Sequence, residues 1–278
     1  MFKDRRLLIA TMHQKEQVIA PLMEQKIGVK CMVPKNFNTD VYGTFSGEVP
    51  RKIPAIDSAR IKCLHAMKIE GCDLGIASEG SFGPHPNLYF VNANEEILLW
   101  IDKKNNLEIT HVEWSLETNF NGKYITNEEE LMVFAKQVKF PTHGIILKKS
   151  KDSNKDIFKG IVEPESLLRI FNQIKNTSNK VFAETDMRAM YNPTRMKVIE
   201  TATTGLIAKI KSCCPSCKRP GFDVSEVVRG LKCSQCSLPT KSILNLIFKC
   251  KGCHYQEERI NPNNKTSEDP TYCDFCNP

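Results

Sequence analysis

Short apolar runs separated by amphipathic stretches open the chain. The runs at 6–11, 28–33 and 72–78 are apolar enough for buried strands, and apolar positions recur with helical spacing at 14–25 and 57–71. Parallel strands need helical connections of this kind between them. The pattern therefore predicts an α/β arrangement for the first part of the chain.

Alternation of apolar and polar positions with a period of two becomes common further along. It predicts strands at 87–93, 95–103 and 107–117, joined by turn-like links rich in Asn and Lys. The remaining predicted elements are helices at 126–138, 164–176 and 195–212 and strands at 142–150 and 180–185. Thr126 and Glu129 have the spacing of a capping box at the first of these helices. The fold class predicted is α/β, with a mixed sheet and flanking helices.

The end of the chain carries a different signal, four C-x-x-C pairs. Nine of the twelve cysteines lie between 213 and 276, and the short apolar run near the N-terminus does not predict an export signal, so metal binding is favoured over disulfides. The candidate ligands are Cys214, Cys217, Cys233, Cys236, Cys250, Cys253, Cys273 and Cys276. Eight thiolates predict two structural Zn²⁺ ions, each held by four sulfurs.

The spacing between pairs permits two pairings. Fifteen residues separate Cys217 from Cys233 and nineteen separate Cys253 from Cys273, as in zinc ribbons arranged in series. We expect this serial pairing, because each half contains a strand-like stretch for its own small hairpin. A cross-braced pairing of the first turn with the third and the second with the fourth has compatible spacing. His254 is an alternative ligand, whereas Cys213 lacks the C-x-x-C spacing to Cys217.

These signals predict three parts of the chain. They are an α/β domain with a candidate ligand site at 1–187, a connecting helix at 188–211 and two tandem four-cysteine zinc ribbons at 212–278. The formal charge of +7 suggests an anionic partner. Two zinc–tetrathiolate sites would each carry −2, however, which would lower the total to about +3. A general nucleic-acid-binding surface is thus weakly supported.

The segment "SEGSFGPHP" at 78–86 follows a predicted buried strand. Glycines allow a ligand to approach the backbone, Glu79 suits a hard cation such as Mg²⁺, and His85 suits proton transfer. Ser81 lies between them. We expect this segment to be a functional loop with Glu79 and His85 as catalytic residues; an ordinary rigid turn is the alternative.

A second candidate segment, "ETDMRAMYNPTRM" at 184–196, follows the last predicted strand. Asp186 is a candidate catalytic or metal-binding carboxylate, and Arg188, Asn192 and Arg195 surround an Asn-Pro helix start where a phosphate could bind. The alternative is a capped helix with solvated arginines.

The third candidate is the turn after the first predicted strand, "ATMHQKE" at 10–16. His13 and Lys15 fall where a phosphate could meet a helix N-terminus. The chain contains neither a Walker-type phosphate loop nor a G-x-G-x-x-G dinucleotide turn.

Two resemblances rest on these segments. The combination of "GCDLGIASEGSFGPHP", "ETDMRAMYNPTRM" and four C-x-x-C turns closing on "CNP" resembles a family of bacterial proteins of unknown function with an α/β N-terminal domain and C-terminal zinc ribbons. That resemblance covers the chain and implies no activity.

Residues 6–85 also resemble the opening half of inosine/xanthosine triphosphate pyrophosphatases. The order of "LLIAT", helix, strand, "DSARIKCLHAM" and a strand ending at Glu79 carries the likeness. It implies an elongated α/β fold and Mg²⁺-dependent hydrolysis of a nucleoside triphosphate to the monophosphate. It also implies that Glu79 binds the metal and that Arg60 and Lys62 lie beside the phosphates. His13 stands where that family has asparagine.

Two functional hypotheses follow. In the first, the α/β domain is a Mg²⁺-dependent hydrolase of a nucleotide or another phosphorylated small molecule, and zinc is structural. In the second, the chain is a non-enzymatic adaptor whose ribbons bind nucleic acid or protein. No stretch is long and apolar enough to span a membrane, so we expect a cytoplasmic protein without a membrane partner.

Overall fold

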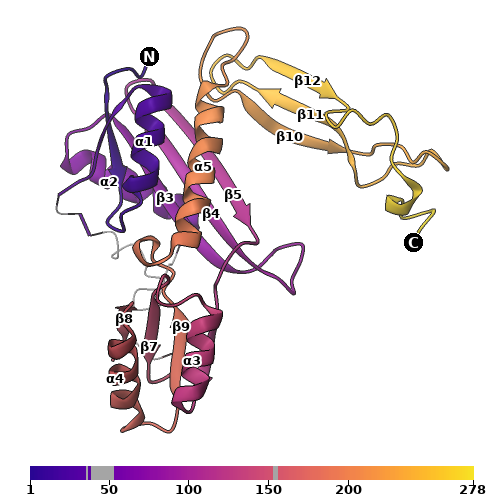
Figure 1. The fold of residues 1–278 in the computed structure, drawn as a ribbon. Helices are drawn as coiled ribbons and strands as arrows, with labels where there is room; N and C mark the ends of the chain where they lie inside the picture. Colours follow the sequence, from indigo (N-terminus) through magenta and orange to yellow (C-terminus); the bar gives the residue numbers. More distant parts are fainter. Residues whose placement is uncertain (36, 39–52, 153–155) are drawn as a thin grey trace. The chain divides into compact units, whose positions relative to one another are not determined.

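The computed structural model contains two compact units. It describes residues 1–35, 37–38, 53–152 and 156–278. The units are residues 1–207 and residues 208–278, and each is described by itself (Figure 1). The helix α5 (Pro193–Lys211) passes through the division between them. In the described parts of the chain, no helix has both the length and the apolar character needed to cross a membrane.

The first sheet is mixed, as predicted. Its strand order is β2-β1-β3-β4-β5; β1 pairs in parallel with β2 and β3, and β4 and β5 are antiparallel. The strands are β1 (Arg6–Ala10), β2 (Lys30–Met32), β3 (Leu74–Pro84), β4 (Asn92–Asp102) and β5 (Leu107–Ser115).

Two helices connect the parallel strands. The helix α1 (Glu16–Ile27) joins β1 to β2, and α2 (Ala55–Ile69) precedes β3, which lies on the other side of β1. Right-handed crossovers place such helices on opposite faces of the sheet. The α2 face is closely packed, because Gly75 would place a β-carbon only 2.7 Å from the Met67 sulfur and 2.8 Å from that of Cys63. The strand β1 lies between β2 and β3, so the chain connections run to opposite sides of β1. In α/β sheets, ligands often bind at the carboxyl ends of the strands where the connections change direction in this way.

The strand β3 is longer than predicted. It continues through Ser78–Phe82 to Pro84, and each of its residues from Leu74 onward pairs with β4. The prediction of a loop at 78–86 is therefore wrong for 78–84: its glycines and polar residues belong to a strand. The predictions of separate strands at 87–93 and 95–103 are wrong in their division: a single strand, β4, begins at Asn92 after the turn that follows Pro84.

A second sheet, absent from the prediction, follows in the same unit. All its pairings are antiparallel, in the order β6-β9-β7-β8, and α3 and α4 contribute to the core on it. Its elements are β6 (Gly122–Ile125), α3 (Glu128–Gln137), β7 (Ile145–Lys148), β8 (Phe158–Ile161), α4 (Pro164–Lys175) and β9 (Val181–Thr185). Its buried helical side chains include Leu131, Phe134, Leu167 and Phe171. The strands β6 and β8 are only four residues long, too short to show a clear periodicity.

The cap of α3 lies one residue later than predicted. Asn127 is the N-cap and accepts a hydrogen bond from the backbone N–H of Glu130, whose carboxylate accepts from the backbone N–H of Thr126. Asn127 and Glu130 thus cap the start of the helix, and the prediction of a capping box from Thr126 to Glu129 is wrong.

The second unit is built on a three-stranded antiparallel meander. The strands β10 (Asp223–Arg229), β11 (Ile243–Lys249) and β12 (Gln256–Ile260) pair in that order. Asp223 pairs with Lys249 at one end of the sheet, and Arg229 pairs with Ile243 toward the other. A short 3₁₀ helix follows the meander at Pro270–Tyr272. Another, at Ala189–Tyr191, belongs to the first unit and precedes α5.

Candidate functional site

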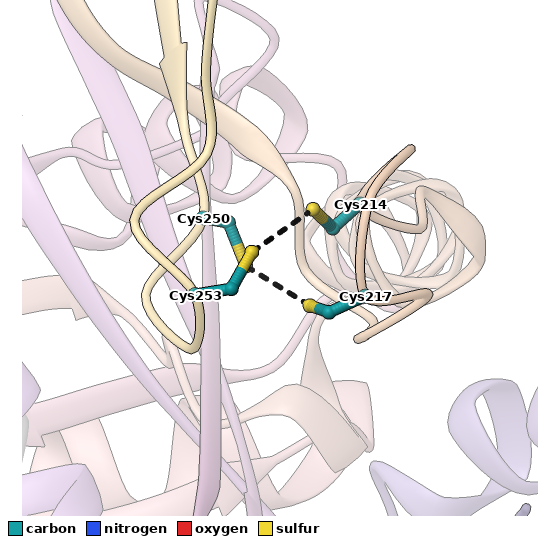
Figure 2. Close-up of side chains that lie close together, drawn as sticks. All are labelled: Cys214, Cys217, Cys250 and Cys253. Atoms are coloured by element: carbon teal, nitrogen blue, oxygen red, sulfur yellow. Dashed lines mark hydrogen bonds between the residues drawn. The ribbon is translucent and has the colours of Figure 1, made fainter.

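Eight cysteines of the second unit form two groups of four. In each group the Sγ atoms all lie within 4.8 Å of one another. The first group contains Cys214, Cys217, Cys250 and Cys253, and the second contains Cys233, Cys236, Cys273 and Cys276. Figure 2 shows Cys214 and Cys217, which follow α5, facing Cys250 and Cys253, which follow β11.

The sulfur spacing fits tetrahedral zinc. In the first group, Sγ of Cys214 lies 3.7 Å from that of Cys253, and Sγ of Cys217 lies 3.5 Å from that of Cys250. The corresponding contacts in the second group are 3.9 Å and 3.6 Å. Four sulfurs around one Zn²⁺, with Zn–S bonds of about 2.3 Å, would lie about 3.8 Å apart. The two groups could therefore hold two zinc ions.

The pairing is cross-braced, so the serial pairing expected from the spacing is wrong. The residues after Cys217 do not form a local hairpin; they form β10, whose seven residues carry the chain about 23 Å away. The strand β11 returns it, which brings Cys250 back to Cys214 and leaves Cys233 at the opposite end of the sheet. The segment after β12 supplies Cys273 and Cys276 to that second end.

The first three C-x-x-C turns share one backbone geometry. The residue after the second cysteine has left-handed φ, and its N–H donates to the carbonyl oxygen of the first cysteine. These residues are Lys218 (φ 61°), Ser237 (φ 62°) and His254 (φ 60°). His254 thus shapes its turn, and neither four-cysteine group includes its ring or the Cys213 thiol.

Backbone amides favour the thiolate form of at least one cysteine in each group. The N–H groups of Cys236 and Gln235 point at the Cys233 sulfur and lower the pKa of that thiol to about 7. Burial raises the pKa of Cys250, but hydrogen bonds from the N–H groups of Cys253 and Gly252, together with those from the Cys217 and Cys214 thiols, lower the pKa to about 6. Zinc binds the thiolate form of cysteine. The lowered pKa values of Cys233 and Cys250 therefore favour the metal-binding form of these ligands before an ion binds.

A second candidate site lies in residues 1–207, at the carboxyl end of β1. The strand β1 ends at Ala10, opposite Ala77, while β3 continues beyond it. Two ammonium groups converge there on the Ser78 carbonyl oxygen: Lys62 Nζ at 2.7 Å and Lys15 Nζ at 3.4 Å. Lys15 also donates to Ser78 Oγ at 2.9 Å. The cations therefore gather at the point where the strand order reverses.

Glu79 belongs to this centre. Its Oε1 lies 2.5 Å from Lys62 Nζ, and the two side chains are 13% and 6% exposed. Burial, and next the Arg195 guanidinium, lower the pKa of Lys15 to about 7. At neutral pH a fraction of Lys15 is therefore neutral, and an incoming anion would favour its charged form.

Arg195 and Glu96 form a fully buried ion pair against β3. Arg195 Nε donates to Glu96 at 2.6 Å, its Nη1 donates to the Met187 carbonyl, and neither side chain of the pair is exposed. Gly80 makes this arrangement fit, because a β-carbon there would lie 2.4 Å from Arg195 Nη2. Arg195 therefore packs as a structural cation beside Lys15. Glu96 is a site residue that the sequence does not predict, since nothing in the local sequence links it to an arginine 99 positions away.

The rest of the 184–196 segment is held by internal contacts. Asp186 pairs with Arg188 at 2.6 Å and accepts from the Gly160 N–H. Asn192 caps α5 by accepting from the Arg195 N–H at 2.9 Å. Asp186 is thus held by Arg188 and by the backbone of Gly160 on β8.

His85 is distant from Glu79. The two residues lie six positions apart along an extended chain, about 20 Å, so they cannot act on one small group together. Nδ1 of His85 accepts from the N–H groups of Asn87 and Leu88, and its ring packs edge-on against Trp114, with centroids 5.5 Å apart.

The remaining predicted ligand-binding residues, His13, Ser81 and Arg60, have different surroundings. The His13 N–H donates to Thr11 Oγ1 in the β1–α1 turn, and Ser81 is half-buried on β3. Arg60 is directed to Asp57 and Glu108. A cavity of about 580 Å³ lies beside the turn, lined by Thr11, Met12, Gln14, Glu16, Val33, Pro34, Lys35, Phe37 and Asn38.

Comparison with known proteins identifies a family. The model of one family, a domain of unknown function (DUF6671), matches residues 62–278. That range includes Glu79, Arg195 and all eight cysteines of the two groups. No curated protein matches the chain.

Proposed function

We infer a function for this chain, which belongs to the DUF6671 family of domains of unknown function, from its two sites. It is a zinc-binding protein with two structural Zn²⁺ ions in residues 208–278. The observation that carries this proposal is the pair of four-thiol groups with the sulfur spacing of tetrahedral zinc. Four protein ligands leave no open position for a substrate, which favours a structural role.

Metal analysis of the purified chain tests the zinc proposal. We expect two Zn²⁺ per chain, and one per chain for Cys236→Ser, which removes one ligand of the second group. The exposed Cys213→Ser is the matched control and should retain two ions. A metal content unchanged by Cys236→Ser would contradict the proposal.

Residues 1–207 supply a second proposed function, a Mg²⁺-dependent hydrolase of a phosphorylated small molecule. The supporting observation is the convergence of Lys15, Lys62 and Glu79 at the carboxyl end of β1. The two lysines would neutralise phosphate charge, which is the main task in phosphoryl transfer. Glu79 would hold Mg²⁺, a hard cation that prefers carboxylate oxygens and supplies charge stabilisation to the phosphoryl oxygens when bound.

Turnover assays test the hydrolase. Zinc-loaded protein with Mg²⁺ should release phosphate or pyrophosphate from nucleoside triphosphates, and Glu79→Gln should abolish this release. The exposed Glu117→Gln is the control. No turnover of any nucleotide, or turnover that survives Glu79→Gln, would reject the assignment.

The nucleic-acid form of the adaptor hypothesis has less support. Residues 208–278 contain eleven Lys and Arg and seven Asp and Glu. Two zinc–tetrathiolate sites would bring the net charge of this unit to about zero. Non-specific nucleic-acid binding depends on positive charge, so a protein partner is the form of adaptor that this charge favours.

A further inference from the structure

We propose that Trp114 is the stacking platform for the base of a nucleotide whose phosphates lie at Lys62 and Glu79. This inference rests on the proposed hydrolase site and names its substrate class. The register of β3, β4 and β5 places Trp114 on the same face of the sheet as Glu79.

The register defines two adjacent rows on that face. Glu79 pairs with Ile97, and Ile97 pairs with Val112. In the next row on the same face, Ser81 pairs with Glu95, and Glu95 pairs with Trp114. Directly opposed residues of antiparallel strands point to the same side, and so do residues two positions apart. Glu79 and Trp114 therefore share a face.

The spacing suits a nucleotide. Two strand separations of about 4.8 Å and one two-residue step of about 6.8 Å place the Cα atoms of Glu79 and Trp114 about 12 Å apart. An extended nucleoside triphosphate can span this distance with its phosphates at one end and its base at the other. The lysine and carboxylate would determine where the phosphates bind, and the indole would bind the base.

Trp114 has the features of a platform. Its side chain is 43% exposed, whereas Trp100, the other tryptophan of the chain, is fully buried. The ring of His85 meets the indole at 72° and is fixed by the two backbone N–H groups that donate to its Nδ1. An aromatic ring held edge-on steadies the indole while its exposed area can accept a planar partner. This assigns a positioning role to His85, which the sequence predicts as a catalytic residue for proton transfer.

Intrinsic fluorescence gives a direct test, because only Trp114 of the two tryptophans is exposed. Zinc-loaded full-length protein is titrated with ATP and Mg²⁺, adenosine, and inorganic triphosphate. We expect saturable quenching by ATP and, at higher concentration, by adenosine, and none by inorganic triphosphate. Equal affinity for ATP and inorganic triphosphate, measured by calorimetry, would overturn the proposal.

Substitutions sharpen the test. Stacking of one base is worth a change in affinity of about 5- to 150-fold. Trp114→Ala should weaken ATP binding by that factor and leave inorganic triphosphate unaffected, and Trp114→Phe should remove the fluorescence change but retain most of the affinity. Tyr272→Ala, which removes an exposed aromatic ring of the other unit, is the control. An unchanged ATP affinity in Trp114→Ala, with its far-UV circular dichroism preserved, would refute the platform.

The outcomes separate the platform from the hydrolase. Quenching by nucleotides without any turnover would support the platform and reject the hydrolase. Turnover of ATP and inorganic triphosphate with equal kcat/KM, insensitive to Trp114→Ala, would support the hydrolase and reject the platform. Neither quenching nor turnover would reject both.

Discussion

Gly80→Ala is the substitution that most directly probes the buried centre of residues 1–207. A β-carbon at Gly80 would lie 2.4 Å from Arg195 Nη2 and 2.6 Å from Glu96 Oε1. The guanidinium cannot move aside freely, because the ion pair with Glu96 and the Met187 carbonyl hold it and its side chain is not exposed.

The cost follows from two known effects. Overpacking of a close-packed core costs about 1–3 kcal/mol, and breaking a buried ion pair costs about 3–5 kcal/mol. The pair would be displaced, with its charges still close together, so we expect Gly80→Ala to lower the free energy of unfolding by about 3 kcal/mol. Both tryptophans lie in residues 1–207, so urea unfolding followed by tryptophan fluorescence reports on this unit.

Gly83→Ala is the matched control on the same strand. No atom lies within 4 Å of a β-carbon built at Gly83, so we expect a change smaller than about 0.5 kcal/mol. Equal stabilities of Gly80→Ala and Gly83→Ala would refute the reasoning, since the close approach of Arg195 to the β3 backbone would then have no energetic consequence.

Three further predictions concern pH, turn geometry and metal. Lys15 has a pKa of about 7 in the folded chain and an ordinary value of 10.5. The unfolded state therefore binds more protons between these values, and stability rises with pH there by up to about 1.4 kcal/mol per unit. Lys15→Met should remove this rise of the unfolding free energy with pH, measured by urea unfolding at pH 7, 8 and 9. An equal rise with pH in the variant and the original protein would contradict the prediction. Ser237→Gly should stabilise the zinc-loaded second unit by about 0.5–1 kcal/mol in thermal unfolding, because φ is 62° there, and a gain no larger than that of Ser234→Gly would contradict the argument. Removal of zinc by a chelator should unfold residues 208–278, seen as a loss of circular dichroism signal, because a module this small depends on its metal. Tryptophan emission should stay unchanged, because both tryptophans lie in residues 1–207; a shift of that emission would contradict the prediction.

The sequence predicts elements well where periodicity is long and local. The helices at 14–25, 57–71 and 164–176 correspond to α1, α2 and α4 because their apolar positions repeat over several turns. The extension of β3 through 78–84 was missed because glycines and polar residues disfavour a strand in isolation. Backbone pairing with β4 along the whole length of β3 stabilises the strand despite its low local propensity.

Long-range geometry explains the remaining misses. The spacing of cysteines is compatible with serial and cross-braced pairing, and the choice depends on β11, a strand that the hairpin argument did not include. Arg195 was predicted as a phosphate ligand from its place at a helix start. Its ion pair with Glu96, on a strand far away in sequence, emerges only in the folded chain.

Zinc content of paired cysteine variants tests the central claim most directly. Cys214→Ser with Cys253→Ser removes two ligands of one group, whereas Cys214→Ser with Cys236→Ser removes one ligand from each group. Cross-bracing predicts one Zn²⁺ per chain for the first variant and none for the second. The reverse result, no zinc in the first variant and one ion in the second, would contradict cross-bracing and restore serial ribbons.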